Sequence, residues 1–359
     1  MLYIFAPGVE TLTHTMVEHW DLLGWGRWLL LIGAVLLYVA SRAGVDALSG
    51  GRTSPGRRAV GHWIPIAATA LVAMVLQRAD LAISIVFATS IGCLSLLVGS
   101  ISILSPDSET PPAFRRLWPF ALPAALLVLL VGFTGQFTFQ HALVLLIEGA
   151  AILLAWKELS VAGDAVLAVG EIDAAPPAER GLWRLGAANL ALCVCLAVVG
   201  AAAGIMGAEG IGRDRPQISD RASVVAVLGP LLVLPMLTAG AALAQKKRAW
   251  VAMTSGVGVV LLNLCLLLPL LILLWYPTHA LHRDASAFLH LRLSAPADVP
   301  PMPFGWVTWR LDNVVLVLLA FMLVPASMGR WRLRRAEGLT LILLYGVYVL
   351  MEAAGTMRS

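Results

Sequence analysis

Ten long apolar runs constrain this chain more than any other feature. Only 13% of its 359 residues are charged and 59% are hydrophobic, whereas soluble domains average about 25% charged residues. So much apolar surface excludes an ordinary soluble globule and a disordered chain. Runs approaching 20 apolar residues are typical of membrane-spanning helices. We therefore predict an all-α integral membrane protein with about ten transmembrane helices, near residues 28–41, 60–76, 81–104, 117–134, 141–156, 185–206, 222–243, 250–275, 311–327 and 339–351.

The distribution of Lys and Arg predicts the orientation of these helices. If the N-terminus lies outside the cytoplasm, 16 of the 25 basic residues fall in cytoplasmic loops and 9 fall outside. Basic residues favour the cytoplasmic side. This predicts a protein of the bacterial inner (plasma) membrane, with both termini outside the cytoplasm. The net charge of +4 is then cytoplasmic-loop charge and needs no nucleic-acid partner.

A charged, proline-containing stretch divides the chain into two halves. We expect a lead-in at 1–27, a first five-helix repeat at 28–157, a cytoplasmic linker at 158–184 and a second five-helix repeat at 185–359. The second repeat includes a long outside loop at 277–309. Because each half has an odd number of spans, the second half enters the membrane from the opposite side. This is the topology of an inverted repeat.

The two halves also match in sequence. Pro65 and Pro235 lie in the second and seventh expected spans, and Arg-Ala follows thirteen residues after each, at 78–79 and 248–249. A proline inside a span removes a backbone donor and disturbs the helix. Interrupted helices at matching positions indicate a midplane binding site. The alternative is that both prolines only kink a packed bundle.

The chain resembles the sodium/calcium exchanger (cation:cation antiporter) superfamily. The resemblance is carried by the layout, by Gly61 and Pro65 in the second span, and by Arg335-Ala336-Glu337-Gly338 before the aromatic last span. That family has Gly-Thr-Ser-x-Pro-Glu on the second span of each half and Gly-Ser-Asn-x-x-Asn on the third. The resemblance implies two inverted five-helix repeats and a membrane transporter that moves ions.

The positions that bind cations in that family have changed here. The glutamates after the two prolines are replaced by Ile66 and Met236, and of the last asparagines only Asn263 is retained, with Cys93 in the first half. No Asp or Glu lies within the second, third, seventh or eighth expected span. A divalent ion needs several oxygen ligands, usually with carboxylate charge. We therefore do not expect sodium/calcium exchange.

Other polar residues remain as candidates. Glu148, in the fifth span, is a candidate proton relay, or alternatively a neutral side chain at a helix contact that Gly149 makes close. His62 is a candidate for binding an anion or a proton, or alternatively an interfacial side chain. Neutral groups on the four central spans could line a path or simply join helices. The candidate path consists of His62, Pro65, Thr69, Thr89, Ser90, Pro235, Thr238, Thr254, Ser255 and Asn263.

The remaining polar features carry weaker predictions. The outside loop holds His279, His282, Asp284 and His290, but its prolines favour an irregular loop, and we expect no metal site and no cofactor. Asp312-Asn313 is expected to cap the ninth helix. We expect no enzyme, because no acid pair lies at one depth in the expected spans.

Two functional hypotheses remain open. In the first, the chain is a transporter that moves a monovalent cation, a proton or a small polar solute by alternating access, and it needs a polar cavity near Pro65 and Pro235. In the second, it is a non-transporting membrane subunit or anchor for a membrane protein partner. The second predicts a site closed by the side chains of Ile66, Met236, Val259 and Val260.

Overall fold

The structure of the protein, a computed structural model, describes most of the chain. The described residues are 26–48, 55–106, 116–170, 183–213, 220–283, 299–305, 308–328 and 333–356. The expected lead-in lies almost entirely outside the described residues, as do the last part of the expected linker and most of the outside loop.

The first half is a series of helices. It comprises α2 (Gly26–Leu48), α3 (Pro55–Val75), α4 (Ala79–Gly92), the π-helical turn η2 (Cys93–Leu97), α5 (Val98–Leu104), η3 (Trp118–Phe120), α7 (Ala121–Val131), η4 (Gly132–Thr134), the short strand β1 (Gln136–Phe137) and α8 (Phe139–Gly170). Helix α8 continues to Gly170, so the chain stays helical well into the expected linker at 158–184.

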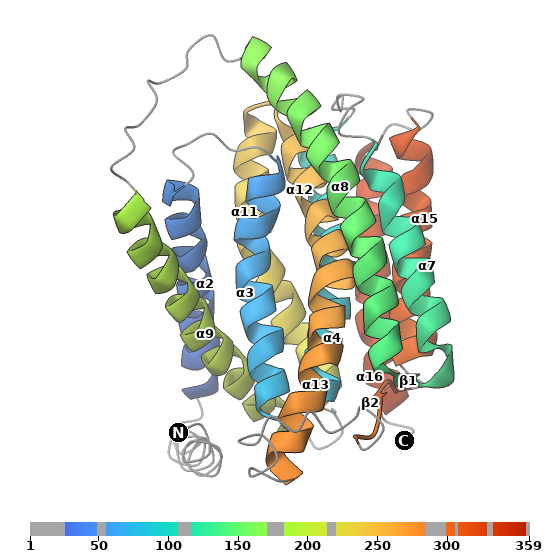
Figure 1. Ribbon diagram of the computed structural model, residues 1–359. Helices are drawn as coiled ribbons and strands as arrows, with labels where there is room; N and C mark the ends of the chain where they lie inside the picture. The colour runs from blue at the N-terminus through green and yellow to red at the C-terminus, as the bar shows by residue number, and fades with distance from the viewer. Residues whose placement is uncertain are drawn as a thin grey trace.

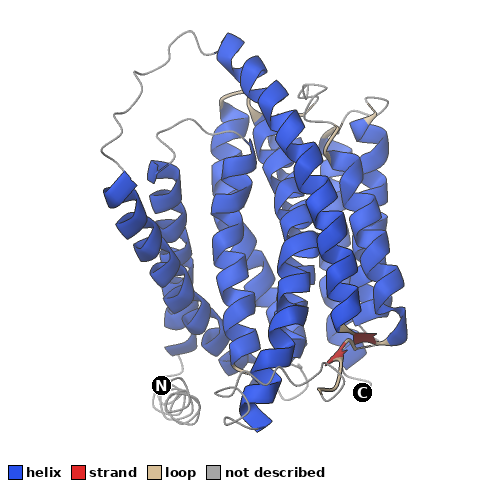
Figure 2. Cartoon of the chain, viewed as in Figure 1, coloured by secondary structure: helices blue, strands red, loops and turns tan. Residues whose placement is uncertain are grey.

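The second half repeats this order. It comprises α9 (Trp183–Arg213), α10 (Asp220–Ser223), the π-helical turn η6 (Val224–Leu228), α11 (Gly229–Gln245), α12 (Ala249–Leu262), η7 (Asn263–Leu267), α13 (Leu268–Arg283), β2 (Met302–Pro303), η9 (Thr308–Asn313), α15 (Val314–Ser327) and α16 (Arg335–Thr356). Strands β1 and β2 pair antiparallel and connect the two halves at one end of the bundle (Figure 2).

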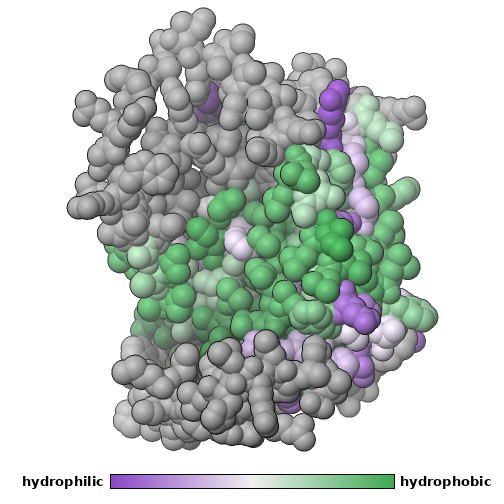
Figure 3. Space-filling view, in the orientation of Figure 1, coloured by the Kyte–Doolittle hydropathy of each residue, from purple (hydrophilic) through white to green (hydrophobic). Residues whose placement is uncertain are grey.

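The helices have the length and composition of a membrane bundle. Among the described residues, seven helices are long and apolar enough to cross a membrane. Three shorter apolar helices, Gly26–Ser41, Trp118–Thr134 and Phe139–Ala155, lie where further spans are expected. Hydrophobic side chains form a band across the middle of the described surface (Figure 3). The all-α integral membrane class is thus confirmed, while the exact number of crossings stays a prediction.

The inverted repeat is visible in the backbone. Helix α12 and the turn η7 begin and end 170 residues after α4 and η2, with Asn263 of η7 matching Cys93 of η2. The loops before them match as well, since Gln77 and Lys247 both adopt positive φ, at 62° and 57°. Helices α3 and α11 run in opposite directions through the bundle (Figure 1). The constant offset predicted from the sequence is therefore a property of the fold.

The two prolines do not interrupt their helices, contrary to the prediction. Pro65 lies inside α3 and Pro235 inside α11. A threonine hydroxyl donates to the carbonyl of each proline, from Thr69 at 2.7 Å and from Thr238 at 3.0 Å. Hydroxyl groups of this kind help a membrane helix tolerate a proline. The irregular backbone lies instead in the π-helical turns, which are typical of functional sites.

Glycines bring the last helix close to the third span. A Cβ atom on Gly338 would lie 2.5 Å from the carbonyl oxygen of Gly99, and one on Gly99 would lie 2.7 Å from that of Gly338. This contact lets α16 pack directly on α5. The Glu337 carboxylate accepts a hydrogen bond from the backbone N–H of Arg334 just before the helix. The Arg-x-Glu-Gly sequence therefore starts and docks α16.

Candidate functional site

Three of the predicted path residues meet at the centre of the bundle. Asn263 Nδ2, at the start of η7, donates to Thr89 Oγ1 and to Ser90 Oγ on α4, each at 3.0 Å. All three side chains are fully buried. The hydroxyls of Thr89 and Ser90 donate in turn to backbone carbonyls of α4 at 2.7 Å. We call Thr89, Ser90 and Asn263 the central cluster.

The central cluster keeps one unused acceptor. Asn263 Oδ1 is buried and makes no hydrogen bond. Buried polar atoms are normally hydrogen-bonded, so a buried orphan acceptor requires an explanation. The cluster carries no formal charge. On α3, α4, α11 and α12 the only acidic residue is Asp80, in the first turn of α4, with an exposed side chain.

Apolar side chains surround the central cluster on these helices. Ile66, Met236, Val259 and Val260, at or near the family's ligand positions, are 0–2% exposed. Met236 Sδ lies 3.9 Å from Cys93 Sγ, the position that matches Asn263. Among the described residues, the polar side chains of the central cluster are therefore neutral hydroxyl and amide groups with apolar neighbours.

The other predicted path residues serve local contacts. Thr69 on α3 is buried, and its hydroxyl also pairs with the Tyr38 hydroxyl of α2 at 2.9 Å. Thr254 accepts a hydrogen bond from Trp118 Nε1 at 3.4 Å, and Ser255 donates to the backbone of its own helix. Thr238 is exposed, while His62 is buried near the start of α3. None of these four hydroxyls has a hydrogen bond with the central cluster.

Glu148 lies half-exposed on α8, beside the π-helical turn η7. Its neighbour Gly149 packs against the carbonyl oxygen of Cys265, which leaves no room for a Cβ atom at that position. The predicted close helix contact is thus present. Glu148 Oε2 is buried without a hydrogen-bond partner. Its role as a proton relay stays a prediction.

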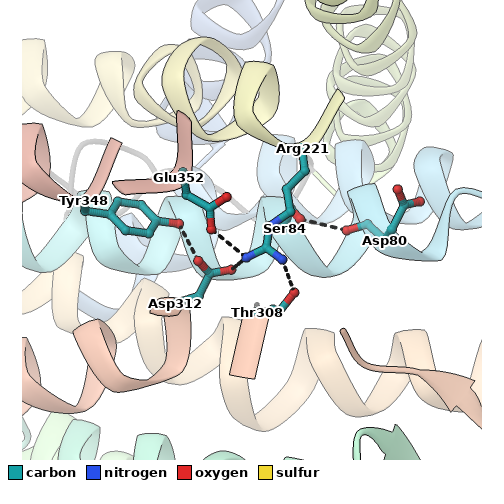
Figure 4. A network of polar contacts seen from close by, with 7 residues as sticks. All are labelled: Asp80, Ser84, Arg221, Thr308, Asp312, Tyr348 and Glu352. Carbon is teal, nitrogen blue, oxygen red and sulfur yellow. Dashed lines mark hydrogen bonds and ion pairs between the residues drawn. The ribbon is translucent and has the colours of Figure 1, made fainter. Parts of the chain in front are cut away.

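A second buried polar site was not predicted. Arg221 Nη2 donates to Asp312 Oδ2 at 2.8 Å and to Glu352 Oε1 at 2.7 Å (Figure 4). Its Nη1 donates to Thr308 Oγ1, and the Tyr348 hydroxyl donates to Asp312 Oδ1 at 3.0 Å. Asp312 is 0% exposed, Glu352 1%, and the Arg221 side chain 15%. We call these five residues the end network.

Three segments build the end network. Arg221 comes from α10, Asp312 and Thr308 from the π-helical turn η9, and Tyr348 and Glu352 from α16. Residues 345, 348 and 352 share one face of α16 because side chains three and four positions apart align on a helix. The hydroxyl of Tyr345 on that face donates to the carbonyl of Val225 at 2.9 Å. The network lies at the end of the bundle where α2 begins and α16 ends (Figure 1).

Two predictions about these residues are wrong. Asn313, at the N-cap of α15, makes no capping side-chain hydrogen bond, and Asp312 pairs with Arg221 instead. Glu352 lies inside a span, because the last candidate span extends to Ala354. An acid pair does lie at one depth, so the reason given against an enzyme fails. The sequence did offer one sign of this network. Arg221, Asp312 and Glu352 lie at the ends of three expected spans that face the same side of the membrane.

The histidines of the outside loop show no metal site among the described residues. The His279 ring stacks on Trp275 with 5.0 Å between centroids. The side chains of His282, Asp284 and His290 lie outside the described residues. Where side chains are described, no group of three metal-ligating residues occurs.

Fold and site define a class of protein: a membrane bundle of two inverted repeats with its polar centre between the π-helical turns. The sodium/calcium exchanger protein family model matches residues 185–353. The sodium-calcium exchanger NCX_Mj soaked with 10 mM Na+ and zero Ca2+ is 17% identical, with a TM-score of 0.60 over 92% of this chain and 98% of that chain. The same exchanger soaked with 10 mM Na+ and 10 mM Sr2+ is 18% identical, with a TM-score of 0.60 over 92% of this chain and 98% of that chain.

A comparison with curated proteins finds no match. The family model matches the second half of the chain, and the structural likeness shows that the chain as a whole has the fold of a sodium-calcium exchanger. Ile66 and Met236 stand at the two positions where the resemblance places the cation-binding glutamates.

Proposed function

We propose that the protein is an exchanger-fold transporter that moves a monovalent cation, a proton or a small polar solute, and not calcium, by alternating access through the layer of the central cluster. The observation that carries the proposal is the buried, unpaired Oδ1 of Asn263 beside the hydroxyls of Thr89 and Ser90. An unused acceptor in an otherwise packed core fits a group that binds a transient ligand.

Charge decides the class of ligand. The cost of taking an ion out of water rises steeply with its charge, and carboxylates normally offset that cost for a divalent cation. The central cluster offers only neutral oxygens, and the neighbouring ligand positions hold Ile66 and Met236. A singly charged or neutral solute needs far less compensation than calcium does.

Flux into liposomes tests the proposal. The purified protein should move at least one of sodium, potassium, protons or a small neutral polar solute, and should show no sodium-driven calcium uptake. Thr89→Val should reduce the flux because it removes a hydroxyl bound to Asn263. Thr340→Val is the matched control, since that exposed hydroxyl also donates to the carbonyl four residues earlier but lies on α16. Equal losses in both variants, or robust calcium uptake, would contradict the proposal.

The packing of the central layer also fits a second candidate, a non-transporting membrane subunit or anchor. The side chains of Ile66, Met236, Val259 and Val260 are all buried, as that hypothesis requires. A transporter closed around its site has the same packing. The flux experiment separates the two candidates, because the subunit would move none of the tested solutes even when its helical content and unfolding temperature are normal.

A further inference from the structure

We propose that the end network is a proton-binding site, in which Asp312 and Glu352 share one proton at neutral pH. This inference goes beyond the proposed function and does not depend on which solute crosses the central cluster. It concerns a different set of helices, α10, η9 and α16, and residues outside the candidate path.

The first step is the count of charges. The buried groups of the end network are two carboxylates and one guanidinium, which leaves one negative charge if both acids are ionised. Among the described residues, the neighbouring charged side chains do not cancel this charge. Asp80, on the neighbouring helix α4, is itself acidic and exposed, and Glu209 on α9 is held by Arg78 at 2.7 Å. Arg310 on η9 is exposed.

An uncompensated buried charge is unfavourable, and one proton removes it. Taking a carboxylate out of water without a partner costs several times what an exposed ion pair gains, so buried acids take up a proton instead. The Arg221 guanidinium compensates one carboxylate. The second carboxylate therefore needs one positive charge from outside the protein.

The second step is the place for the proton. Asp312 and Glu352 accept from the same nitrogen of Arg221, so the two carboxyl groups are neighbours. Glu352 Oε2 is buried and has no hydrogen-bond partner (Figure 4). A carboxyl proton supplies the missing donor between two groups that otherwise only accept.

The third step excludes a bare metal ion. A hard cation needs several oxygen ligands at once. In the end network Asp312 Oδ1 accepts from Tyr348, and Asp312 Oδ2, Glu352 Oε1 and Thr308 Oγ1 accept from Arg221. Within the five residues this leaves Glu352 Oε2 as the carboxylate oxygen without a hydrogen bond, which is one acceptor for one proton.

The proton then stabilises a contact among three helical segments. When it leaves, two adjacent carboxylates face a single guanidinium, and their repulsion separates α16 from η9. Protonation of the Asp312–Glu352 pair is thereby linked to the packing of α16 against η9 and α10.

Infrared spectroscopy tests this inference on the full-length protein. Because Glu148 is another carboxyl group in a membrane helix, the measurements use a Glu148→Gln background. At neutral pH we expect the carbonyl stretch of a buried protonated carboxylic acid. Either Asp312→Asn or Glu352→Gln should remove the band, since the remaining carboxylate pairs with Arg221 and stays ionised. Glu209→Gln, at the Arg78 ion pair, should leave it unchanged.

Several outcomes would overturn the inference. These are the absence of the band at neutral pH, its survival in both single variants, or its loss on adding sodium but not choline, which would assign the site to a metal cation. If neither single variant folds, Tyr348→Phe serves instead, because it keeps both carboxyl groups and removes one donor. The band should then persist at a shifted frequency, and an unshifted band would contradict a proton shared at Asp312.

Discussion

The central cluster and the end network are both buried and polar, but they differ in charge. The central cluster joins neutral groups from two matching helices of the inverted repeat. The end network joins three charged side chains from three segments of the second half alone. The central cluster, between α4 and η7, holds no charged side chain, whereas the end network joins three charged side chains where α10, η9 and α16 meet.

The difference shows that a low overall charge does not mean an uncharged interior. A charged side chain near the end of a span can reach a partner on another span while its backbone stays close to the interface. The same side chain at the bilayer centre needs a ligand or a partner at its own depth. Four changes test how far the two regions depend on this rule.

Restoring the family's glutamates should give the largest effect. Ile66→Glu with Met236→Glu places two acids in the central layer, at a cost of about 5–7 kcal/mol by membrane-insertion scales. Calcium should recover much of that stability, which thermal unfolding in detergent with and without calcium will measure. The matched control is Ile66→Gln with Met236→Gln, which should show no calcium response. Stabilisation by calcium of both double variants, or of neither, would contradict the view that the central layer lacks only carboxylate charge for binding calcium.

Removing the cation of the end network should come next. Arg221→Met leaves two buried carboxylates without their partner, and breaking a buried pair in this way costs about 3–5 kcal/mol. Arg78→Met is the control, because its ion pair with Glu209 is partly exposed and should contribute about 1 kcal/mol or less. Unfolding temperatures of the two variants provide the measurement. Equal shifts would show that the end network is no more important than a surface pair.

Removing the amide of the central cluster should have a moderate effect on stability. Asn263→Leu deletes two interhelical hydrogen bonds, which in membrane proteins contribute about 1–2 kcal/mol together. Flux should fall far more than stability, because the proposed ligand group is lost. Liposome flux and unfolding of the same preparation provide both values. A stable variant with unchanged flux would remove Asn263 from the proposed path.

The smallest effect is expected from Tyr348→Phe. The change removes one hydrogen bond to Asp312 and leaves the ion pairs with Arg221 in place, so about 1 kcal/mol should be lost. Tyr345→Phe is a matched control on the same helix face, since its hydroxyl binds only a backbone carbonyl. Unfolding measured across pH should change shape only for Tyr348→Phe. An identical profile in both variants would argue that Tyr348 does not contribute to the proton site.

Much of the fold could be predicted because its signals are local or periodic. Apolar runs predicted the spans, and the constant spacing after Pro65 and Pro235 predicted the repeat that the π-helical turns now confirm. The effect of the prolines was misjudged, because the sequence does not show that Thr69 and Thr238 hydroxyls would support continuous helices. The pairing of Asn263 with Thr89 and Ser90 followed only from the fold.

By itself, the sequence determined the membrane class, the two repeats and the absence of carboxylates from the four central expected spans, since each depends on composition or spacing along the chain. Only the tertiary structure decided that Arg221, Asp312 and Glu352 form one network. Arg221 is separated from Asp312 by 91 residues and from Glu352 by 131. Near a span end, a residue that caps its helix and one that pairs across the bundle have the same local sequence. The difference arises only when α16 and η9 pack around α10.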